Sequence, residues 1–132
     1  MCKAMYDKEY RPKRMARPGT REKNYKNYIK YNYSITLEKL IELWDKQEGK
    51  CPCCLTELPH PEDWNTPKWE ISIDHDHSCC SQKSKSCGKC VRGILCRDCN
   101  LMIGHAKDKQ ETLARSINYL EETSMKGSTQ NL

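Results

Sequence analysis

The sequence predicts a small α+β domain that is held together by zinc. Three observations predict it: an amphipathic helix pattern over about residues 37–47, two short strand patterns on either side of a cysteine-rich loop, and two C-x-x-C pairs. A metal staple is expected because only 36% of the 132 residues are hydrophobic and none is Phe, so the apolar core must be small. The ten cysteines supply candidate ligands.

The helix pattern is the clearest periodic signal in the chain. Four apolar residues follow the i, i+3, i+4 and i+7 spacing of one helix face: Leu37, Leu40, Ile41 and Trp44. Thr36 is a suitable N-cap, and Gly49 is a suitable C-terminal stop. We therefore expect a helix from about Leu37 to Gln47, with Trp44 in the core.

Two strands and two further helices are expected after this helix. Residues 69–73 alternate apolar and polar side chains as a half-buried strand does, and residues 91–96 resemble a second short strand. A helix can start in residues 99–105. Asp108 and Glu111 resemble a capping box for a terminal helix whose apolar face has three members: Leu113, Ile117 and Leu120.

The cysteines fall into two groups with the spacing of metal ligands. Two C-x-x-C pairs, 41 residues apart, can share one structural zinc: Cys51, Cys54, Cys96 and Cys99. Cys53 lies inside the first pair and is interpreted as a bystander. Four more cysteines fall between the predicted strands and allow a second zinc site: Cys79, Cys80, Cys87 and Cys90. The alternatives for this second group are a labile disulfide or free thiols.

Charge is distributed unevenly along the chain. Residues 1–33 hold ten Lys/Arg against three Asp/Glu, and six tyrosines are interleaved with them, which favours an arm that contacts DNA. The predicted DNA contacts are Arg11, Lys13, Arg14, Arg17 and Arg21, together with Arg92 from the second strand. The alternative is a solvated, partly helical tail. We expect the arm to be followed by a zinc-stapled domain over 34–123 and a flexible tail over 124–132.

The N-terminus has no apolar run typical of a signal peptide, and no stretch of about 18 apolar residues could span a membrane. We therefore expect a thiol-reducing, cytoplasmic location. In that compartment cysteines are more often metal ligands than disulfides.

The run Asp74-His75-Asp76-His77, at the end of the first predicted strand, has the chemistry of phosphodiester hydrolysis. A histidine can activate water near neutral pH, and carboxylate and amide oxygens suit Mg²⁺. Alternate residues of a strand share a face, so Asp74 and Asp76 would point one way unless the strand ends first. The alternative is that both histidines are zinc ligands. Asn100 follows Cys99 directly, so zinc would fix its helix relative to the strand.

These motifs resemble the phage recombination endonuclease VII family, a zinc-containing branch of the His-Me finger (HNH-like) nucleases. The resemblance covers about residues 36–122 and rests on the C-x-x-C pair, D-H-D-H, and V-R-G-I-L-C-R-D-C-N from Val91 to Asn100. It implies a ββα-metal finger in which Asp74 and Asn100 hold Mg²⁺ or Mn²⁺, His75 is the general base and His77 orients or shields the site. It also implies zinc on the two C-x-x-C pairs.

Two positions depart from the junction-resolving members of that family. Ile103 and Ser72 stand where those members carry Glu and His, so the preference between branched junctions and nicked or ordinary duplex stays open. Those members are dimers, and whether this chain forms a homodimer stays open. The alternative functions are a non-catalytic zinc module that binds nucleic acid and a zinc finger that binds a protein partner.

Overall fold

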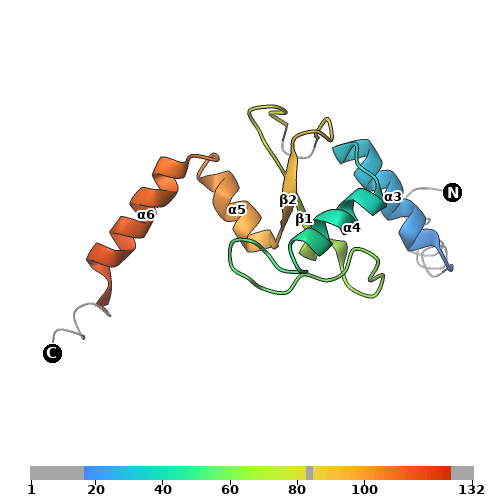
Figure 1. The fold of residues 1–132 in the computed structure, drawn as a ribbon, viewed down its shortest axis with the longest axis horizontal. Helices are drawn as coiled ribbons and strands as arrows, with labels where there is room; N and C mark the ends of the chain where they lie inside the picture. Colours follow the sequence, from blue (N-terminus) through green and yellow to red (C-terminus); the bar gives the residue numbers. More distant parts are fainter. Residues whose placement is uncertain (1–16, 83–84, 126–132) are drawn as a thin grey trace, which may run out of the picture. The chain divides into compact units, whose positions relative to one another are not determined.

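The computed structural model describes residues 17–82 and 85–125. The chain divides into two compact units, residues 1–97 and 98–132. The elements of the first unit are drawn in Figure 1: α3 (Thr20–Tyr33), α4 (Leu37–Lys46), the 3₁₀ turn η2 (Lys68–Glu70), β1 (Ser72–His75) and β2 (Val91–Leu95). Helix α5 (Arg97–His105) starts at the boundary, and α6 (Gln110–Thr123) belongs to the second unit. This is the predicted small α+β composition.

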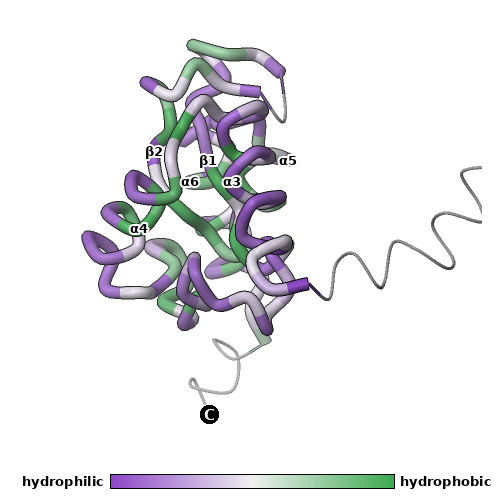
Figure 2. The backbone as a smooth tube through the Cα atoms, turned by 90° about the vertical axis from the view of Figure 1, so that its right-hand side faces the viewer, coloured by the Kyte–Doolittle hydropathy of each residue, from purple (hydrophilic) through white to green (hydrophobic). Residues whose placement is uncertain are grey.

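Helix α3 contributes to the core through a stripe of large side chains on one face. Tyr25, Ile29 and Tyr33 recur every four residues and are 7%, 0% and 8% exposed. The rings of Tyr25 and Tyr33 pack inside the unit, so they cannot offer their faces to nucleic acid. Tyr31, which is 72% exposed, remains on the surface. Figure 2 shows that α3 otherwise carries mostly hydrophilic residues.

Helix α4 confirms the strongest sequence prediction. Thr36 is the N-cap and its hydroxyl accepts a hydrogen bond from the Lys39 backbone N–H at 3.2 Å. Past the helix end, Gly49 adopts a φ of +69°, and a Cβ there would lie 2.7 Å from the Trp44 ring. Trp44 is half-buried, and its indole N–H donates to the Leu58 carbonyl at 3.2 Å. The tryptophan therefore joins the helix to the chain that follows it.

The two strands form an antiparallel ribbon that begins later than the sequence pattern predicts. Residues 68–70 form η2 instead of strand, and Trp69 is 63% exposed because it lies in that turn. Strand β1 starts at Ser72 and includes Asp74 and His75. The alternating pattern from Trp69 was therefore misleading, whereas β2 confirms the predicted second strand to within one residue.

A β-bulge interrupts the ribbon at the residues of greatest chemical interest. Asp74 pairs with Gly93, whereas His75 pairs with Val91, so the register shifts by one residue and passes over Arg92. Bulges of this kind re-aim side chains near functional sites. Here the regular alternation of faces ends between Asp74 and His75.

Helix α4 packs on β2, and the two elements are joined by one side chain. Gln47 donates from Nε2 to the Ile94 carbonyl at 2.8 Å and accepts from the Ile94 N–H at 2.8 Å. It also donates to the Lys50 carbonyl at 3.1 Å. Because Ile94 is fully buried, these bonds satisfy backbone groups that water cannot reach.

The second unit holds α6 and all but the first residue of α5. The predicted capping box is wrong: α6 begins at Gln110 after Lys109, and no side-chain hydrogen bond caps it. The three residues of its predicted apolar face lie in the helix at the expected spacing. Two of them, Ile117 and Leu120, are nevertheless 58% and 64% exposed. Among the helices that the structure describes, none combines the length and apolar character needed to cross a bilayer.

Candidate functional site

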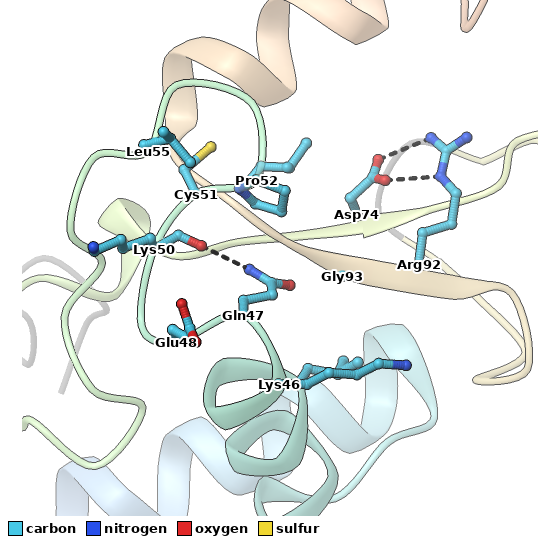
Figure 3. A pocket seen from close by; sticks show the side chains of 12 residues that line it. Lys46, Gln47, Glu48, Lys50, Cys51, Pro52, Leu55, Asp74, Arg92 and Gly93 are labelled. Carbon is cyan, nitrogen blue, oxygen red and sulfur yellow. Dashed lines mark hydrogen bonds and ion pairs between the residues drawn. The ribbon is translucent and has the colours of Figure 1, made fainter.

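An open groove of about 660 Å³ runs along the end of α4 and the adjacent face of the β-ribbon (Figure 3). Its lining combines three cations with two carboxylates: Lys46, Lys50, Arg92, Glu48 and Asp74. The other lining residues are Leu43, Gln47, Cys51, Pro52, Leu55, Gly93 and Leu95. The groove therefore places positive charge around the first residue of the predicted catalytic run.

Asp74 and Arg92 form a two-pronged ion pair in this groove. Arg92 donates from Nε to Oδ2 of Asp74 at 2.8 Å and from Nη2 to Oδ1 at 3.0 Å, as the dashed lines in Figure 3 show. The Asp74 side chain is only 10% exposed and that of Arg92 is 39% exposed. The register shift of the ribbon passes over Arg92 itself. Its guanidinium neutralises a carboxylate that would otherwise be buried and unpaired.

His75, the next residue of the run, is 1% exposed. Its Nε2 is 3.1 Å from the Cys80 carbonyl oxygen and 2.9 Å from that of Gln82. Carbonyl oxygens only accept hydrogen bonds, so Nε2 must carry the proton, and the neutral ring keeps its lone pair on Nδ1. The His77 ring lies tilted beside it with centroids 4.5 Å apart, and the Tyr33 ring meets it edge-on at 6.2 Å.

Asp76, the other acid of the run, stabilises a turn. Asp76 Oδ1 accepts hydrogen bonds from the Ser78 backbone N–H at 2.9 Å and from the Ser78 hydroxyl at 2.6 Å. Both bonds lower the pKa of Asp76 below its ordinary value, and the bond from the Ser78 hydroxyl has the larger effect. Because β1 ends at His75, Asp76 lies outside the strand and does not share a strand face with Asp74. It caps the turn that starts the cysteine-rich loop.

The first cysteine group is brought together as the spacing predicts. The sulfur atoms of this knuckle cluster lie within 4.8 Å of one another: Cys51, Cys54, Cys96 and Cys99. Cys54 and Cys96 Sγ are 3.7 Å apart, close to the separation of about 3.8 Å that tetrahedral zinc with bonds of about 2.3 Å imposes. A disulfide would need about 2.05 Å. The four cysteines therefore could hold zinc, and Cys53 stays outside the group as expected.

The second cysteine group is also brought together. The sulfur atoms of this loop cluster lie within 4.8 Å of one another: Cys79, Cys80, Cys87 and Cys90. Cys87 Sγ is 3.8 Å from that of Cys79 and 3.9 Å from that of Cys90. Hydrogen bonds from the backbone N–H groups of Lys89 and Cys90 lower the pKa of the Cys87 thiol to about 7. This arrangement also could hold zinc, and its sulfurs are too far apart for a disulfide.

The other predicted site residues are distributed as follows. Asn100 lies half-buried in α5, so its role as a metal ligand stays a prediction. Arg17 is exposed, and Arg21 donates to the Trp64 carbonyl at 2.8 Å. Three predicted DNA contacts lie outside the described residues: Arg11, Lys13 and Arg14.

Sequence reasoning missed Lys46 and Lys50 as part of the site. Both belong to the segment 34–74, whose net charge is negative, so a count over the segment hid them. Their position at the end of the predicted helix, just before the first C-x-x-C pair, is the signal that could have found them. The structure places both on the wall of the groove that contains Asp74.

Comparison with known proteins adds a family to this geometry. Residues 26–122 match the family model of recombination endonuclease VII. Gene 59 protein of Mycobacterium phage D29 is 31% identical over 100 residues, which cover 75% of this chain and 51% of that protein. Gene 59 protein of Mycobacterium phage L5 is 31% identical over 112 residues, 84% of this chain and 57% of that protein. The chain thus spans little more than half the length of these relatives.

Proposed function

The chain belongs to the recombination endonuclease VII family, and from this premise we propose that it is a metal-dependent DNA endonuclease of the His-Me finger type. His75 is the general base that activates water. Asp74 and Asn100 hold the catalytic Mg²⁺ or Mn²⁺, and His77 shields the base. The observation that carries the proposal is the pair of carbonyl oxygens at Nε2 of His75.

Those two carbonyls support the role of His75 as a base over a role as a zinc ligand. They hold the proton on Nε2 and keep the Nδ1 lone pair available to accept a proton from water. Both sets of four thiols are complete without a histidine. Burial of the ring by Tyr33 and His77 fixes its orientation, as a base that must meet a positioned water requires.

The groups present fit a hard divalent ion. Asp74 lines the groove, and each of its oxygens keeps a second lone pair while Arg92 uses the first. One carboxylate from Asp74 and one amide from Asn100 would hold the ion with oxygen atoms, the ligands that Mg²⁺ prefers. When bound, the ion would neutralise charge on the scissile phosphate and the leaving oxygen. Arg92 remains beside Asp74 as a second positive charge for the phosphate.

The charge of the groove supports DNA as the substrate. Lys46 and Lys50 are exposed on the wall that also carries Asp74 and Arg92. A phosphate backbone lying in the groove would be neutralised by these cations. The exposed lysines and arginine of α3, together with Arg17 before it, would extend this contact as a DNA-binding arm.

Cleavage assays test the proposal directly. Purified protein is incubated with linear duplex, nicked duplex and a four-way junction, with Mg²⁺, with Mn²⁺ and with EDTA. We expect cleavage that EDTA abolishes, and a loss of about 10²–10⁴-fold in rate for His75→Ala. The matched control is His105→Ala, which changes an exposed histidine outside the proposed site. Wild-type rates in His75→Ala would refute the mechanism, and the preferred substrate would show whether junctions are resolved.

One observation favours a second candidate function. Asp74 is already paired with Arg92, and His75 is fully buried, as both would be if the run were only structural. A non-catalytic zinc module would bind DNA through its basic surface without cutting it in any divalent metal. It would also lose thermal stability equally on replacement of His75 and of a cysteine ligand.

A further inference from the structure

The loop between β1 and β2 connects the second cysteine group to the proposed base. Cys80 belongs to the loop cluster through its sulfur, and its carbonyl oxygen lies 3.1 Å from Nε2 of His75. One residue therefore offers a metal ligand at one end and an acceptor for His75 at the other. Gln82, two residues further along the same loop, provides the second acceptor.

The same loop is tied to the fold at several other points. The Asp76 backbone N–H donates to the Cys90 carbonyl at 2.9 Å, which closes the base of the loop. Ser86 is buried, and its N–H donates to the Asn32 carbonyl at the end of α3 at 2.8 Å. Gly88, with a φ of +87°, lies so close to α3 that a Cβ would be 2.6 Å from the Ser34 carbonyl oxygen.

These bonds hold both ends of the loop, but the turn that carries Cys80 has few of its own. The Cys79 and Cys80 N–H groups both donate to the Asp76 carbonyl at 3.1 Å, and Ser78 donates to the Asp76 side chain. The approach of four sulfurs adds to these short-range bonds. Without a central ion, four thiols, two of them exposed and two half-buried, gain little from such an approach. With a central zinc ion, a metal bond would fix each sulfur, and the bond to the Cys80 sulfur would also fix the Cys80 backbone.

We propose that the loop cluster binds a second structural zinc ion, and that this ion holds His75 in its Nε2–H form by fixing the carbonyl of Cys80. The catalytic consequence rests on the proposed function, in which His75 is the base. The cysteines act as positioning residues, because none of them touches the reacting atoms. Partners that orient a functional histidine typically change activity by about 10–100-fold when removed.

Zinc content is the first test, and it does not depend on nuclease activity. Wild-type protein, purified without chelators, is expected to contain two zinc ions per chain by native mass spectrometry. The double variant Cys87→Ser/Cys90→Ser should contain one, and its retained zinc shows that the knuckle cluster still folds. The control Cys53→Ser removes a cysteine outside both clusters and should retain two. One zinc ion per chain in the wild type would overturn the proposal.

The state of His75 is the second test. In ¹⁵N-labelled protein the Nδ1 and Nε2 shifts of His75, assigned with His75→Ala, should show one fixed tautomer in the wild type and in Cys53→Ser. In the double variant they should move toward the average of two tautomers. Unchanged His75 shifts after loss of the second zinc would disprove the coupling. These outcomes decide the inference even if the wild type cuts no DNA, which would refute only the proposed function.

Kinetics provide the third test if the wild type is active. The double variant should show kcat reduced by about 10–100-fold with KM unchanged, because the DNA-binding groove is not altered. A KM increase with unchanged kcat would assign the loop to substrate binding and overturn the proposal.

Discussion

The two cysteine clusters have the same ligand number and similar sulfur spacing, yet they occupy different kinds of place in the molecule. The knuckle cluster draws on segments more than forty residues apart, and its Cys51 and Cys99 are 0% and 8% exposed. The loop cluster lies within twelve residues between β1 and β2, and Cys79 and Cys87 are exposed. Closing a long loop constrains the unfolded chain more than closing a short one.

The difference separates the tasks of the two sites. A zinc ion in the knuckle cluster would act on the whole fold, because the apolar core around Ile29, Leu40 and Ile94 is small. An ion in the loop cluster would act locally on the loop that reaches His75.

The largest effect is expected from Cys51→Ser. Structural zinc in small domains contributes about 10 kcal/mol to folding, as much as the whole stability of a typical domain. The variant should therefore lose its cooperative thermal transition in circular dichroism, whereas Cys87→Ser/Cys90→Ser and Cys53→Ser should keep one. A wild-type melting temperature in Cys51→Ser would remove the distinction between the clusters.

A smaller loss of stability is expected from Gln47→Ala, beside the knuckle cluster. The change leaves the buried N–H and carbonyl groups of Ile94 without their partner, at a cost of about 1–3 kcal/mol. Chemical denaturation should detect it, with Glu48→Ala, an exposed neighbour, as the control. Equal stability of the two variants would show that zinc alone joins α4 to β2.

On the side of the loop cluster, Gly88→Ala should have a more local effect of about 1–2 kcal/mol. The new Cβ would meet the Ser34 carbonyl, and the positive φ adds strain. Hydrogen exchange should show faster exchange of the Ser86 amide and the end of α3, with α4 and β2 protected as in the wild type. Lys89→Ala, in the same turn, serves as the control. Global acceleration would contradict a local role.

The smallest effect is expected on DNA affinity. Lys50→Ala removes a charge from the groove and should weaken binding several-fold, with the slope of log K against log salt reduced by about one. Lys89→Ala removes the same charge from the loop, outside the groove lining, and should leave the slope unchanged. Equal slopes for the two variants would show that DNA does not lie in this groove.

The sequence predicts some parts of this molecule well because local rules determine them. The helix from Leu37, its Thr36 cap and strand β2 follow from periodicity and side-chain chemistry within a few residues. Both cysteine groups follow from ligand spacing. In each case the residues that form the pattern also make the contact.

Other parts depend on contacts that no local pattern records. The ion pair of Arg92 with Asp74 accompanies a one-residue shift in strand pairing, which the two strand patterns cannot reveal. Arg92 was predicted to contact DNA, and that contact stays a prediction beside the ion pair. Tyr25 and Tyr33 were interpreted by composition, although their four-residue spacing with Ile29 marks a buried helix face.

The side chain of Gln47 has a consequence for the behaviour of this protein at high concentration. A two-stranded ribbon has two open edges, each able to recruit a strand from another molecule. By bonding to both the N–H and the carbonyl of Ile94, the Gln47 amide occupies the positions that a third strand would use. The residue that joins α4 to β2 thereby also protects one edge of the ribbon against aggregation.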